Sequence, residues 1–553
     1  MKTERWDFWK IVTVVILLIF LLFLVYPMVS MFIKGFQDPA TGDWTLKHYQ
    51  KFFGKRYYYR ALLNSFKVTF AVTILSVLVG VPIAYFMSYY HIKGSGFLEI
   101  IIIISMMSPA FIGAYSWILL LGRNGVVTRF LSGILGIQMP SIYGFGGILL
   151  VFTLKLYPFI FMYVSGALKK FDVSLEEAAE SLGCHGPKKI FGIILPLITP
   201  SIFAGALMVF MNSLADFGTP QLIGEGFVTM PVLVYSEFVS EMGGEAHFAA
   251  SMANIMIFIT AVMFTLQKSY INRKSYTMSA LNPIVKKDLK GIRSVLVHGF
   301  IYLVVLLSFV PQLTVMYTSF LNTNGSIFLP GYSLGSYRKI FSTLGTAIRN
   351  TYLYGAAAIL LILVLGVLIA YISVKRRNLL TGIIDTVTMV PYIIPGSVLG
   401  ITLLLAFNKK PLILSGTALI IIISLVIRRL PYTLRSSSAI LYQIDPHIEE
   451  ASISLGCKPM MTFLRITVIL MLPGVLSGAI LSWITVINEL SSSVILYSGR
   501  TRTMSVAIYT EVVRGNYGTA AALSTILILT TIVSLVIFFS LTKKKGDRII
   551  DMG

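Results

Sequence analysis

Residues 174–184 read Ser-Leu-Glu-Glu-Ala-Ala-Glu-Ser-Leu-Gly-Cys, and residues 447–457, 273 positions later, read His-Ile-Glu-Glu-Ala-Ser-Ile-Ser-Leu-Gly-Cys. In both copies apolar or small residues fall at i, i+3, i+4 and i+7, which places them on one face of a short helix. These residues are Leu175, Ala178, Ala179 and Leu182 in the first copy, and Ile448, Ala451, Ser452 and Leu455 in the second. Gly183 and Gly456 follow, and glycine suits the left-handed conformation that ends many helices. The chain therefore carries one helical loop element twice.

The starts of the two loop helices also carry recognisable signals. Ser174 with Glu177 predicts a capping box, in which the serine caps the helix and the glutamate reaches back. In the second copy Asp445 is expected to cap, and Pro446 fits the first helical position. Duplication of the whole pattern favours a docking element for a partner. The alternative is a re-entrant helix packed on its own bundle.

The repeat extends well beyond these loops. Residues Asn64-Ser65-Phe66 and Gly80…Ala84-Tyr85 recur 286 positions later as Asn350-Thr351-Tyr352 and Gly366…Ala370-Tyr371. Pro109 is matched with Pro391, and from Pro158 and Pro431 onward the offset is 273, pairing Asp172 with Asp445, Gly205 with Gly478, and Asp216 with Glu489. Chance similarity between apolar helices explains matched polar residues poorly. Because each half has the same number of predicted helices, we expect two parallel repeats.

The composition excludes a soluble globular protein. Hydrophobic residues make up 56% of the 553 residues and charged residues 12%, with a mean hydropathy of +0.83, whereas soluble domains carry about 25% charged residues. Since a spanning helix needs about 20 apolar residues, we expect spans near 11–33, 61–90, 97–121, 144–166, 194–217, 246–267, 294–319, 348–374, 380–407, 412–430, 467–497 and 517–542. The predicted fold class is an all-α integral membrane protein with about 12 transmembrane helices in two six-helix halves.

The net charge of +22 has a simple explanation in the loops. Placing the N-terminus inside gives the inner loops more Lys and Arg than the outer ones, as the positive-inside rule requires. The inside set includes Lys2, Arg5, Lys10, Lys169, Lys170, Lys188, Lys189, Lys274, Lys375, Arg376, Arg377, Lys458, Lys543, Lys544, Lys545 and Arg548. Both termini and both loop helices are then cytoplasmic, and nucleic acid is not needed to account for the charge.

These features predict five consecutive regions. They are an N-terminal helix with an external segment (1–60), a first transmembrane domain (61–267), a linker with a seventh helix and an external segment (268–345), a second transmembrane domain (346–542) and a basic tail (543–553). The polar stretch 268–293 is expected to be a solvated tether. The two cysteines, Cys184 and Cys457, are too few for a disulfide framework.

The loop residues resemble the EAA signature of binding-protein-dependent ABC transporter permeases. That signature is Glu-Ala-Ala, three residues, Gly, nine residues, then Ile-x-Leu-Pro. The first half matches it at Glu177, Ala178, Ala179, Gly183, Ile193, Leu195 and Pro196, and the second at Glu450, Ala451, Ser452, Gly456 and Ile466. The second half departs at Val468-Ile469, where Leu-Pro is expected.

The resemblance implies a MetI-like fold in a bacterial cell membrane, with both permease halves fused in one chain. It also implies that the residues Glu177, Ala178, Ala179, Gly183, Glu450, Ala451, Ser452 and Gly456 couple the chain to two copies of a cytoplasmic ATPase. An extracytoplasmic binding protein would deliver the cargo. The chain has no Gly-x-x-x-x-Gly-Lys-Ser/Thr phosphate loop, so it is expected to be no enzyme and to need no cofactor, ATP being bound by the partners.

Four charged residues fall within or beside predicted spans and form two repeat pairs. Lys155 pairs with Arg428, and Asp216 pairs with Glu489. Charges inside a membrane are functional candidates by default, so one interpretation is a polar lining of the translocation path. The alternative is mutual ion pairing or snorkelling near an interface. No catalytic group or metal motif stands out.

The cargo is suggested by a short run. Residues 214–219, Leu-Ala-Asp-Phe-Gly-Thr, resemble the pattern of iron(III) permeases, and Asn488-Glu489-Leu490-Ser491 resembles its second-half counterpart. Ferric iron is therefore the expected cargo. Thiamine and aminoalkylphosphonate importers remain alternatives, and an ion-coupled secondary transporter is the alternative from a different class, although such a carrier has no reason to duplicate a docking loop.

Overall fold

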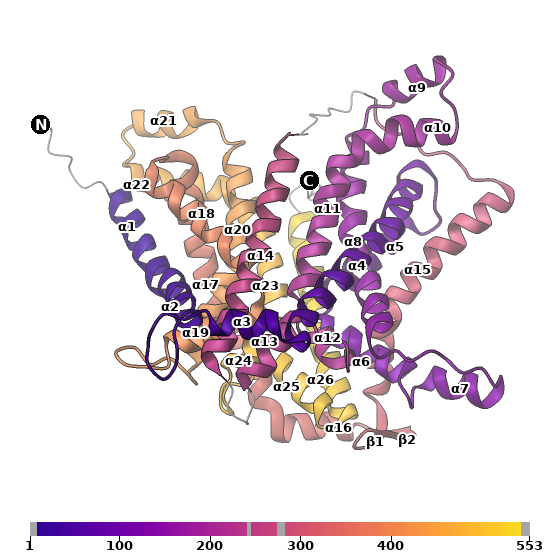
Figure 1. Ribbon diagram of the computed structural model, residues 1–553. Helices are drawn as coiled ribbons and strands as arrows, with labels where there is room; N and C mark the ends of the chain where they lie inside the picture. Colours follow the sequence, from indigo (N-terminus) through magenta and orange to yellow (C-terminus); the bar gives the residue numbers. More distant parts are fainter. Residues whose placement is uncertain (1–7, 240–244, 274–281, 544–553) are drawn as a thin grey trace, which may run out of the picture. The chain divides into compact units, whose positions relative to one another are not determined.

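The computed structural model describes residues 8–239, 245–273 and 282–543. These residues form helices joined by loops, together with one two-stranded sheet (Figure 1). The basic residues Lys2, Arg5, Lys274, Lys544, Lys545 and Arg548 lie outside the described residues, as do the tail beyond 543 and part of the linker. The chain divides into two compact units. Unit 1 comprises Met1–Phe53, Val234–Ile257 and Asn322–Lys545, and unit 2 comprises Gly54–Leu233, Phe258–Leu321 and Gly546–Gly553.

Unit 2 is built around the first repeat. Its elements are α4 (Arg56–Tyr89), α5 (Ser95–Met107), α6 (Ala110–Leu121), α7 (Val126–Ile134), α8 (Phe145–Lys169), α9 (Ser174–Ser181), α10 (Pro187–Lys189), a π-helical turn (Ile190–Ile194), α11 (Leu195–Ala215), α12 (Gly218–Ile223) and α15 (Gly291–Thr318). The helices α13 (Met230–Val239) and α14 (Ala246–Arg273) are divided between the units.

Unit 1 is built around the second repeat. Its elements are α1 (Phe8–Phe20), a π-helical turn (Leu21–Val25), α2 (Tyr26–Gly35), α3 (Lys47–Gly54), β1 (Leu321–Asn324), β2 (Ile327–Tyr332), α16 (Gly335–Lys339), a π-helical turn (Ile340–Leu344), α17 (Gly345–Lys375), α18 (Leu379–Ile393), α19 (Gly396–Ala406), α20 (Ala418–Leu441), α21 (Pro446–Ser454), α22 (Pro459–Thr462), a π-helical turn (Phe463–Thr467), α23 (Val468–Ile487), α24 (Ser493–Leu496), α25 (Met504–Val513) and α26 (Tyr517–Lys543).

Matched residues do the same structural work in the two units, which confirms the repeat. The side chain of Ser65 accepts a hydrogen bond from Met230 N over 2.8 Å, and Thr351, 286 positions on, accepts one from Met504 N over 2.7 Å. The glycines of the helix crossings also correspond. A Cβ on Gly205 would lie 3.2 Å from Cα of Ile160, and one on Gly478 would lie 2.5 Å from Cα of Thr433. Small residues let the backbones of α8 and α11, and of α20 and α23, approach closely.

The predicted spans are largely confirmed, with four corrections, one of which is that the helix expected at 467–497 ends at Ile487. Among the described residues, nine helices are long and apolar enough to cross a membrane, or eleven if each of two bent pairs counts as one span. The bent pairs replace the straight helices expected at 97–121 and 380–407, since α5 and α6 meet at 102° and α18 and α19 at 113°. The segment expected at 412–430 is α20, which begins at Ala418 and continues to Leu441.

The structure also corrects the partner assigned to Pro109. Pro109 precedes α6, and the residue that precedes α19 in the same way is Pro395. Pro391 lies inside α18 instead. The pairing of Pro109 with Pro395 keeps the offset at 286, as in the earlier part of the repeat. A second proline four residues away had made the sequence alignment ambiguous.

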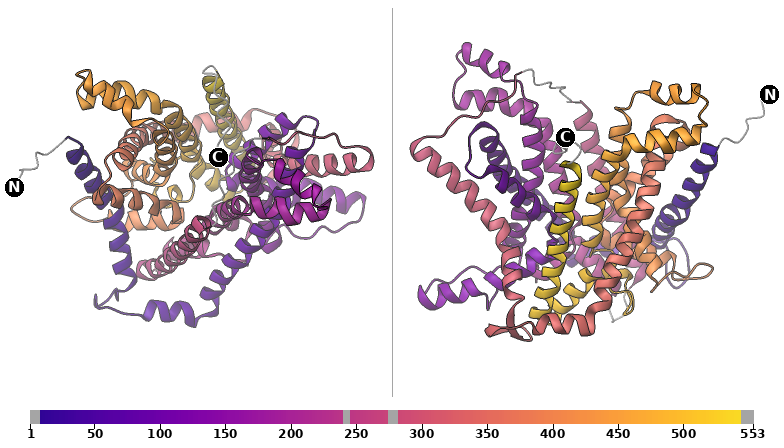
Figure 2. Two further views of the ribbon diagram at one scale, coloured as in Figure 1. Left: turned by 90° about the horizontal axis from the view of Figure 1, so that it is seen from above. Right: turned by 180° about the vertical axis from the view of Figure 1, so that it is seen from behind.

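The first helix of each half packs on helices of the other half. In unit 1, α1 packs on α17 and α18, and α2 packs on α19 (Figure 2). The Trp9 ring lies 4.4 Å from that of Tyr371 and 4.9 Å from that of Phe463, measured between centroids. In unit 2, α15 packs on α5 and α6. The compact units and the sequence repeats are thus different divisions of the chain, and the domain ranges given above remain predictions.

Candidate functional site

The first loop helix, α9, ends as its sequence predicts but begins differently. Gly183 has φ +81°, Gly183 N donates to Glu180 O, and Cys184 N donates to Ala179 O over 2.9 Å. These two bonds form a Schellman motif, which satisfies the last carbonyls of the helix. The expected capping box is wrong, because the helix begins after Val173 and Ser174 lies inside it. Instead, the carboxylate of Asp172 accepts from Ser174 N over 3.0 Å.

The second loop helix, α21, repeats this arrangement. The side chain of Asp445 accepts from His447 N over 2.9 Å, and Pro446 occupies the first turn, so both predictions for this start are confirmed. Gly456 has φ +90°, and Cys457 N donates to Ser452 O over 3.1 Å. Both loop helices therefore have an aspartate at the start and a left-handed glycine at the end. Hydrogen bonds at both ends thus define where each short helix begins and ends.

A buried glutamate anchors α9 to its bundle. Glu176 is only 5% exposed, accepts a hydrogen bond from the Tyr89 hydroxyl over 2.9 Å and forms an ion pair with Lys189. Lys189 also pairs with Glu180 over 2.6 Å. The hydrogen bond from Lys189 holds the pKa of Glu180 below its ordinary value. Lys189 lies just after the loop, so this cluster ties the start of the next membrane helix to α9.

The counterpart of Glu176 anchors α21 in the same way. Glu449 accepts hydrogen bonds from the Thr467 hydroxyl over 2.7 Å and from the Tyr371 hydroxyl over 3.4 Å. The sequence analysis singled out Glu177 and Glu450, but both are exposed in the structure. It missed Glu176 and Glu449. The signal available was their match at offset 273, one residue before the motif glutamates.

The exposed side of each loop helix carries leucine and alanine. Leu182 is 88% exposed and Leu455 is 87% exposed. The predicted single face is divided, because Ala179 and Ser452 are buried against their bundles whereas Ala178 and Ala451 face outward. An apolar side chain is thus almost fully exposed at the same place in both loops. The two motif glutamates lie on the same helices and are exposed with them.

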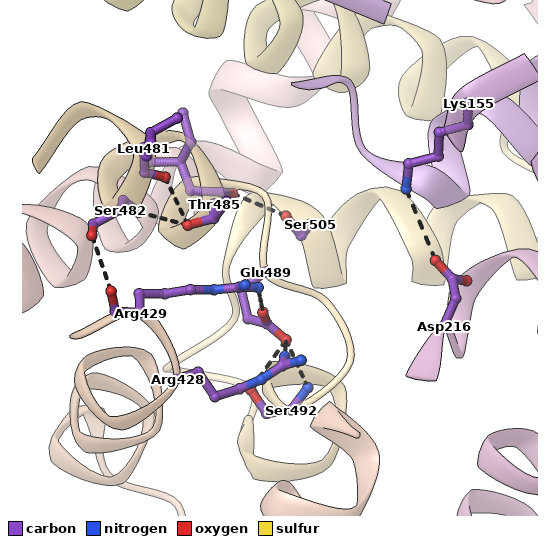
Figure 3. Close-up of polar contacts among 11 residues, drawn as sticks. Lys155, Asp216, Arg428, Arg429, Leu481, Ser482, Thr485, Glu489, Ser492 and Ser505 are labelled. Atoms are coloured by element: carbon purple, nitrogen blue, oxygen red, sulfur yellow. Dashed lines mark hydrogen bonds and ion pairs between the residues drawn. The ribbon is translucent and has the colours of Figure 1, made fainter. Parts of the chain in front are cut away.

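The four intramembrane charges form two matched ion pairs, which Figure 3 shows together with their neighbours. In unit 2, Lys155 Nζ lies 3.9 Å from a carboxylate oxygen of Asp216. In unit 1, Arg428 pairs with Glu489, and the neighbouring Arg429 pairs with the other oxygen of the same carboxylate. The structure thus shows mutual ion pairing for all four residues. The assignment of these residues to a translocation path stays a prediction.

Each acid also caps the turn that follows its helix. Asp216 accepts from Thr219 N over 2.9 Å, and Glu489 accepts from Ser492 N over 3.1 Å. The basic partners sit at the eleventh residue of α8 and of α20, respectively. Lys155 and Arg428 are therefore at equivalent positions in their helices, and the observed bounds of α20 remove the difference that the predicted segments implied. The pairs fix the end of one membrane helix to the middle of another.

The cluster in unit 1 is more strongly cationic and more crowded. Arg428, Arg429 and Glu489 expose 13%, 16% and 2% of their side chains. The position of Arg429 corresponds to Leu156 in the first repeat, so the second guanidinium has no counterpart there. Gly396, at the start of α19, lies directly against Arg428, and a Cβ there would collide with its guanidinium. The lack of a side chain at Gly396 therefore leaves room for the guanidinium of Arg428.

Comparison with known families accords with this geometry. The sequence pattern of the family described as "Binding-protein-dependent transport system inner membrane component" matches this chain twice, at residues 58–276 and 362–546. The two matches contain the two loop helices and the two ion pairs. Together they cover more than half of the chain. The duplication found in the sequence is thus a duplication of this one domain.

Named relatives are similar over most of the chain or over one half of it. The "Ferric transport system permease protein FbpB" of Actinobacillus pleuropneumoniae is 30% identical over 93% of this chain and 75% of its own length. The "Putative ferric transport system permease protein FbpB 1" of Haemophilus influenzae is 29% identical over 86% of this chain and 76% of its own length. The "Putative 2-aminoethylphosphonate transport system permease protein PhnU" of Salmonella typhimurium is 23% identical over 44% of this chain and 86% of its own length.

Proposed function

Because this chain belongs to the family of binding-protein-dependent transport system inner membrane components, carrying its domain twice, we propose that it supplies both membrane halves of one ATP-driven importer. Two copies of a cytoplasmic ATPase would dock on α9 and α21, one on each loop helix. A binding protein on the opposite side would deliver the cargo. In this arrangement both termini are cytoplasmic, the chain hydrolyses no ATP, and it holds no cofactor of its own.

The observation that carries this proposal is the duplicated loop helix with its exposed leucine. Leu182 and Leu455 are the apolar residues that a docking groove would cover. Behind them, Glu176 and Glu449 connect each helix to the following membrane helix through Lys189 and Thr467. Movement of a docked ATPase would therefore be transmitted to α11 and α23, since each helix starts within the same hydrogen-bonded cluster. Such movement would reach the ion pairs Lys155–Asp216 and Arg428–Glu489, because their acids lie just after the far ends of α11 and α23.

Ferric iron is the cargo that we propose. Two relatives that align over 93% and 86% of this chain are named as ferric transport permeases, whereas the phosphonate relative aligns over less than half of it. The run 214–219, which resembles the iron(III) permease pattern, contains Asp216 of the first ion pair. Import of an aminoalkylphosphonate is the second candidate, supported by that shorter alignment.

Uptake measurements decide between these cargoes. Cells that lack the chain, its ATPase and its binding protein should regain ATP-dependent accumulation of radioactive ferric iron when all three are restored. Excess 2-aminoethylphosphonate should not compete. The same cells carrying an ATPase that cannot hydrolyse ATP are the control and should stay at background. Accumulation of labelled phosphonate without iron would favour the second candidate, and accumulation of either without the ATPase would contradict the importer.

The exposed leucines provide a direct test of docking. We expect Leu182→Asp and Leu455→Asp each to weaken ATPase binding, since full burial of a leucine is worth about 1.5–3 kcal/mol, or roughly 10- to 150-fold in affinity. The double variant should lose the ATPase during purification in detergent. Leu334→Asp is the matched control, because Leu334 is 55% exposed in the segment assigned to the outer side. Undiminished co-purification of the ATPase with the double variant would exclude these residues from the interface.

A further inference from the structure

The linker segment, defined here as residues 282–290, leads from the region between the halves into α15. Its backbone pairs with the loop that follows α4. Lys287 N donates to Tyr89 O over 2.9 Å, and His91 N donates to Lys287 O over 3.0 Å, as in a parallel bridge. The sequence analysis predicted a solvated tether here. Seven of the segment's nine residues are exposed, as in a solvated segment, but two hydrogen bonds fix its backbone to α4 and the loop after it, so the segment is not a free tether.

The same segment reaches the start of α9. Val173 N donates to Asn282 O over 3.0 Å. The first N–H groups of a helix have no partner within the helix, so the linker supplies the carbonyl that this one needs. The charge of Lys287 also contributes, after the hydrogen bond from Lys189, to the lowered pKa of Glu180. The linker therefore contacts the N-terminus of α9 and places a cation near its acidic side.

Two apolar side chains of the linker segment pack inward, whereas the other seven residues are exposed. Ile284 and Leu289 pack against the hydrophobic core of unit 2, which includes Tyr89, Ile92 and Phe171. Val285, next to Ile284, is 78% exposed. Apolar packing and backbone pairing act together at one place, beside the Tyr89 that also holds Glu176. The linker and the first loop helix thus share an anchoring residue.

In the part of the chain that the structure describes, no segment from outside the loop hydrogen-bonds to the backbone at the start of α21 as residues 282–290 do at that of α9. The residue equivalent to Val173 is Pro446, and proline has no N–H to donate. The loop after α17 turns directly into α18, where the side chain of Asn378 accepts from Thr381 N over 2.9 Å. Aspartate and proline complete the start of α21 from within the loop itself. The two loop helices are therefore supported by different means.

From these contacts we propose that the linker segment is a positioning element, which holds the first loop helix, and only the first, in the orientation that its ATPase requires. The inference rests on the proposed docking role of α9. The chain that fuses the two halves then also sets the geometry of one of its two docking sites. Two permease halves made as separate chains would have no segment joining them, and so no such segment to hold α9.

The natural cysteines allow a test within a single chain. Cys184 and Cys457 lie at the ends of α9 and α21, respectively, so the rate of maleimide labelling of each reports on its own loop helix. In the full transporter with its ATPases, Ile284→Asp with Leu289→Asp should increase labelling of Cys184 several-fold and leave Cys457 unchanged. Val285→Asp is the matched control and should change neither rate. Conservative changes, Ile284→Leu with Leu289→Ile, should restore the slow labelling of Cys184.

ATP-driven uptake is measured in the same preparations and should fall several-fold in the aspartate double variant alone. Unchanged labelling of Cys184 in that variant would overturn the inference. An equal increase at Cys457 would also overturn it, because the whole fold would then be loosened. Faster labelling of Cys184 with normal uptake would support the linker's hold on α9 and contradict the proposed docking role, so the two failures are distinguishable.

Discussion

Replacing Glu489 with glutamine is expected to destabilise the protein more than any other single change to a charged residue described here. The carboxylate is 2% exposed and pairs with both Arg428 and Arg429. Glutamine has a similar size but no charge, so two buried guanidiniums would lose their counter-ion. Breaking a buried ion pair from one side costs about 3–5 kcal/mol. We expect purified Glu489→Gln to lose its monodisperse form at a markedly lower temperature than the parent protein.

Two variants on the same unit separate this effect from a general sensitivity to mutation. Asp385→Asn also removes a carboxylate that pairs with an arginine, since Asp385 lies 3.2 Å from Arg435. The side chain of Asp385 is 35% exposed, however, and that of Arg435 is 51% exposed. Such exposed pairs contribute about 0–1 kcal/mol, so Asp385→Asn should melt like the parent. Arg429→Leu converts the cluster into the one-to-one pair of the first repeat, and we expect it to be better tolerated than Glu489→Gln. Equal melting of Glu489→Gln and the parent protein would contradict the predicted role of the cluster.

Replacing Gly183 and Gly456 together with valine is expected to abolish transport while leaving membrane insertion intact. Both glycines have positive φ, +81° and +90°. A residue with a side chain costs roughly 1–2 kcal/mol in this conformation, and β-branched valine is a poor fit. If both loops must keep their shape, the two costs combine to a roughly 30- to 1000-fold loss of correctly shaped chains. The uncoupling should appear as ATP hydrolysis that continues without uptake.

A matched control lies close to the first of these glycines. Gly192 is exposed, has no atom within 4 Å of the position that a Cβ would take, and is not among the glycines with positive φ. Gly192→Val therefore adds the same side chain to the same region without backbone strain and should transport normally. Surface biotinylation and detergent extraction would show that the double variant, the Gly192→Val control and the parent protein insert equally. Wild-type coupling in the double variant would remove the loop ends from the mechanism.

The fold class followed from composition and repeat, because both are properties of the whole chain. The hydrophobic content of 56% and the matched polar residues at fixed offsets do not change when the bounds of a single helix are predicted wrongly. Helix ends and bends were less predictable. Hydropathy shows that 97–121 and 380–407 are apolar but not that each bends at a proline, since Pro82 and Pro158 lie inside continuous helices. The bends depend on the tertiary neighbours of each proline.

The site was predicted in position more than in mechanism. The motif identified α9 and α21 and their terminal glycines, because caps are local features. The anchoring role of Glu176 and Glu449 depends on Tyr89 and Thr467, which approach only in the folded chain. The pairing of Lys155 with Asp216 could be considered but not decided from the sequence. Sequence distance gave no means to tell a lining residue from a paired one.

The packing of α1 on α17 also constrains how the protein can be made. Tyr371, on which Trp9 packs, is synthesised 362 residues after Trp9. At about 5–20 residues per second this takes roughly 20 to 70 seconds. During that interval the first helix must remain in the bilayer without its packing partners. Its segment Phe8–Gly35 has the most apolar window of the nine spans found in the described residues. Lipid can therefore serve as its partner until the second half is synthesised, and only 28% of this window is buried by the protein afterwards.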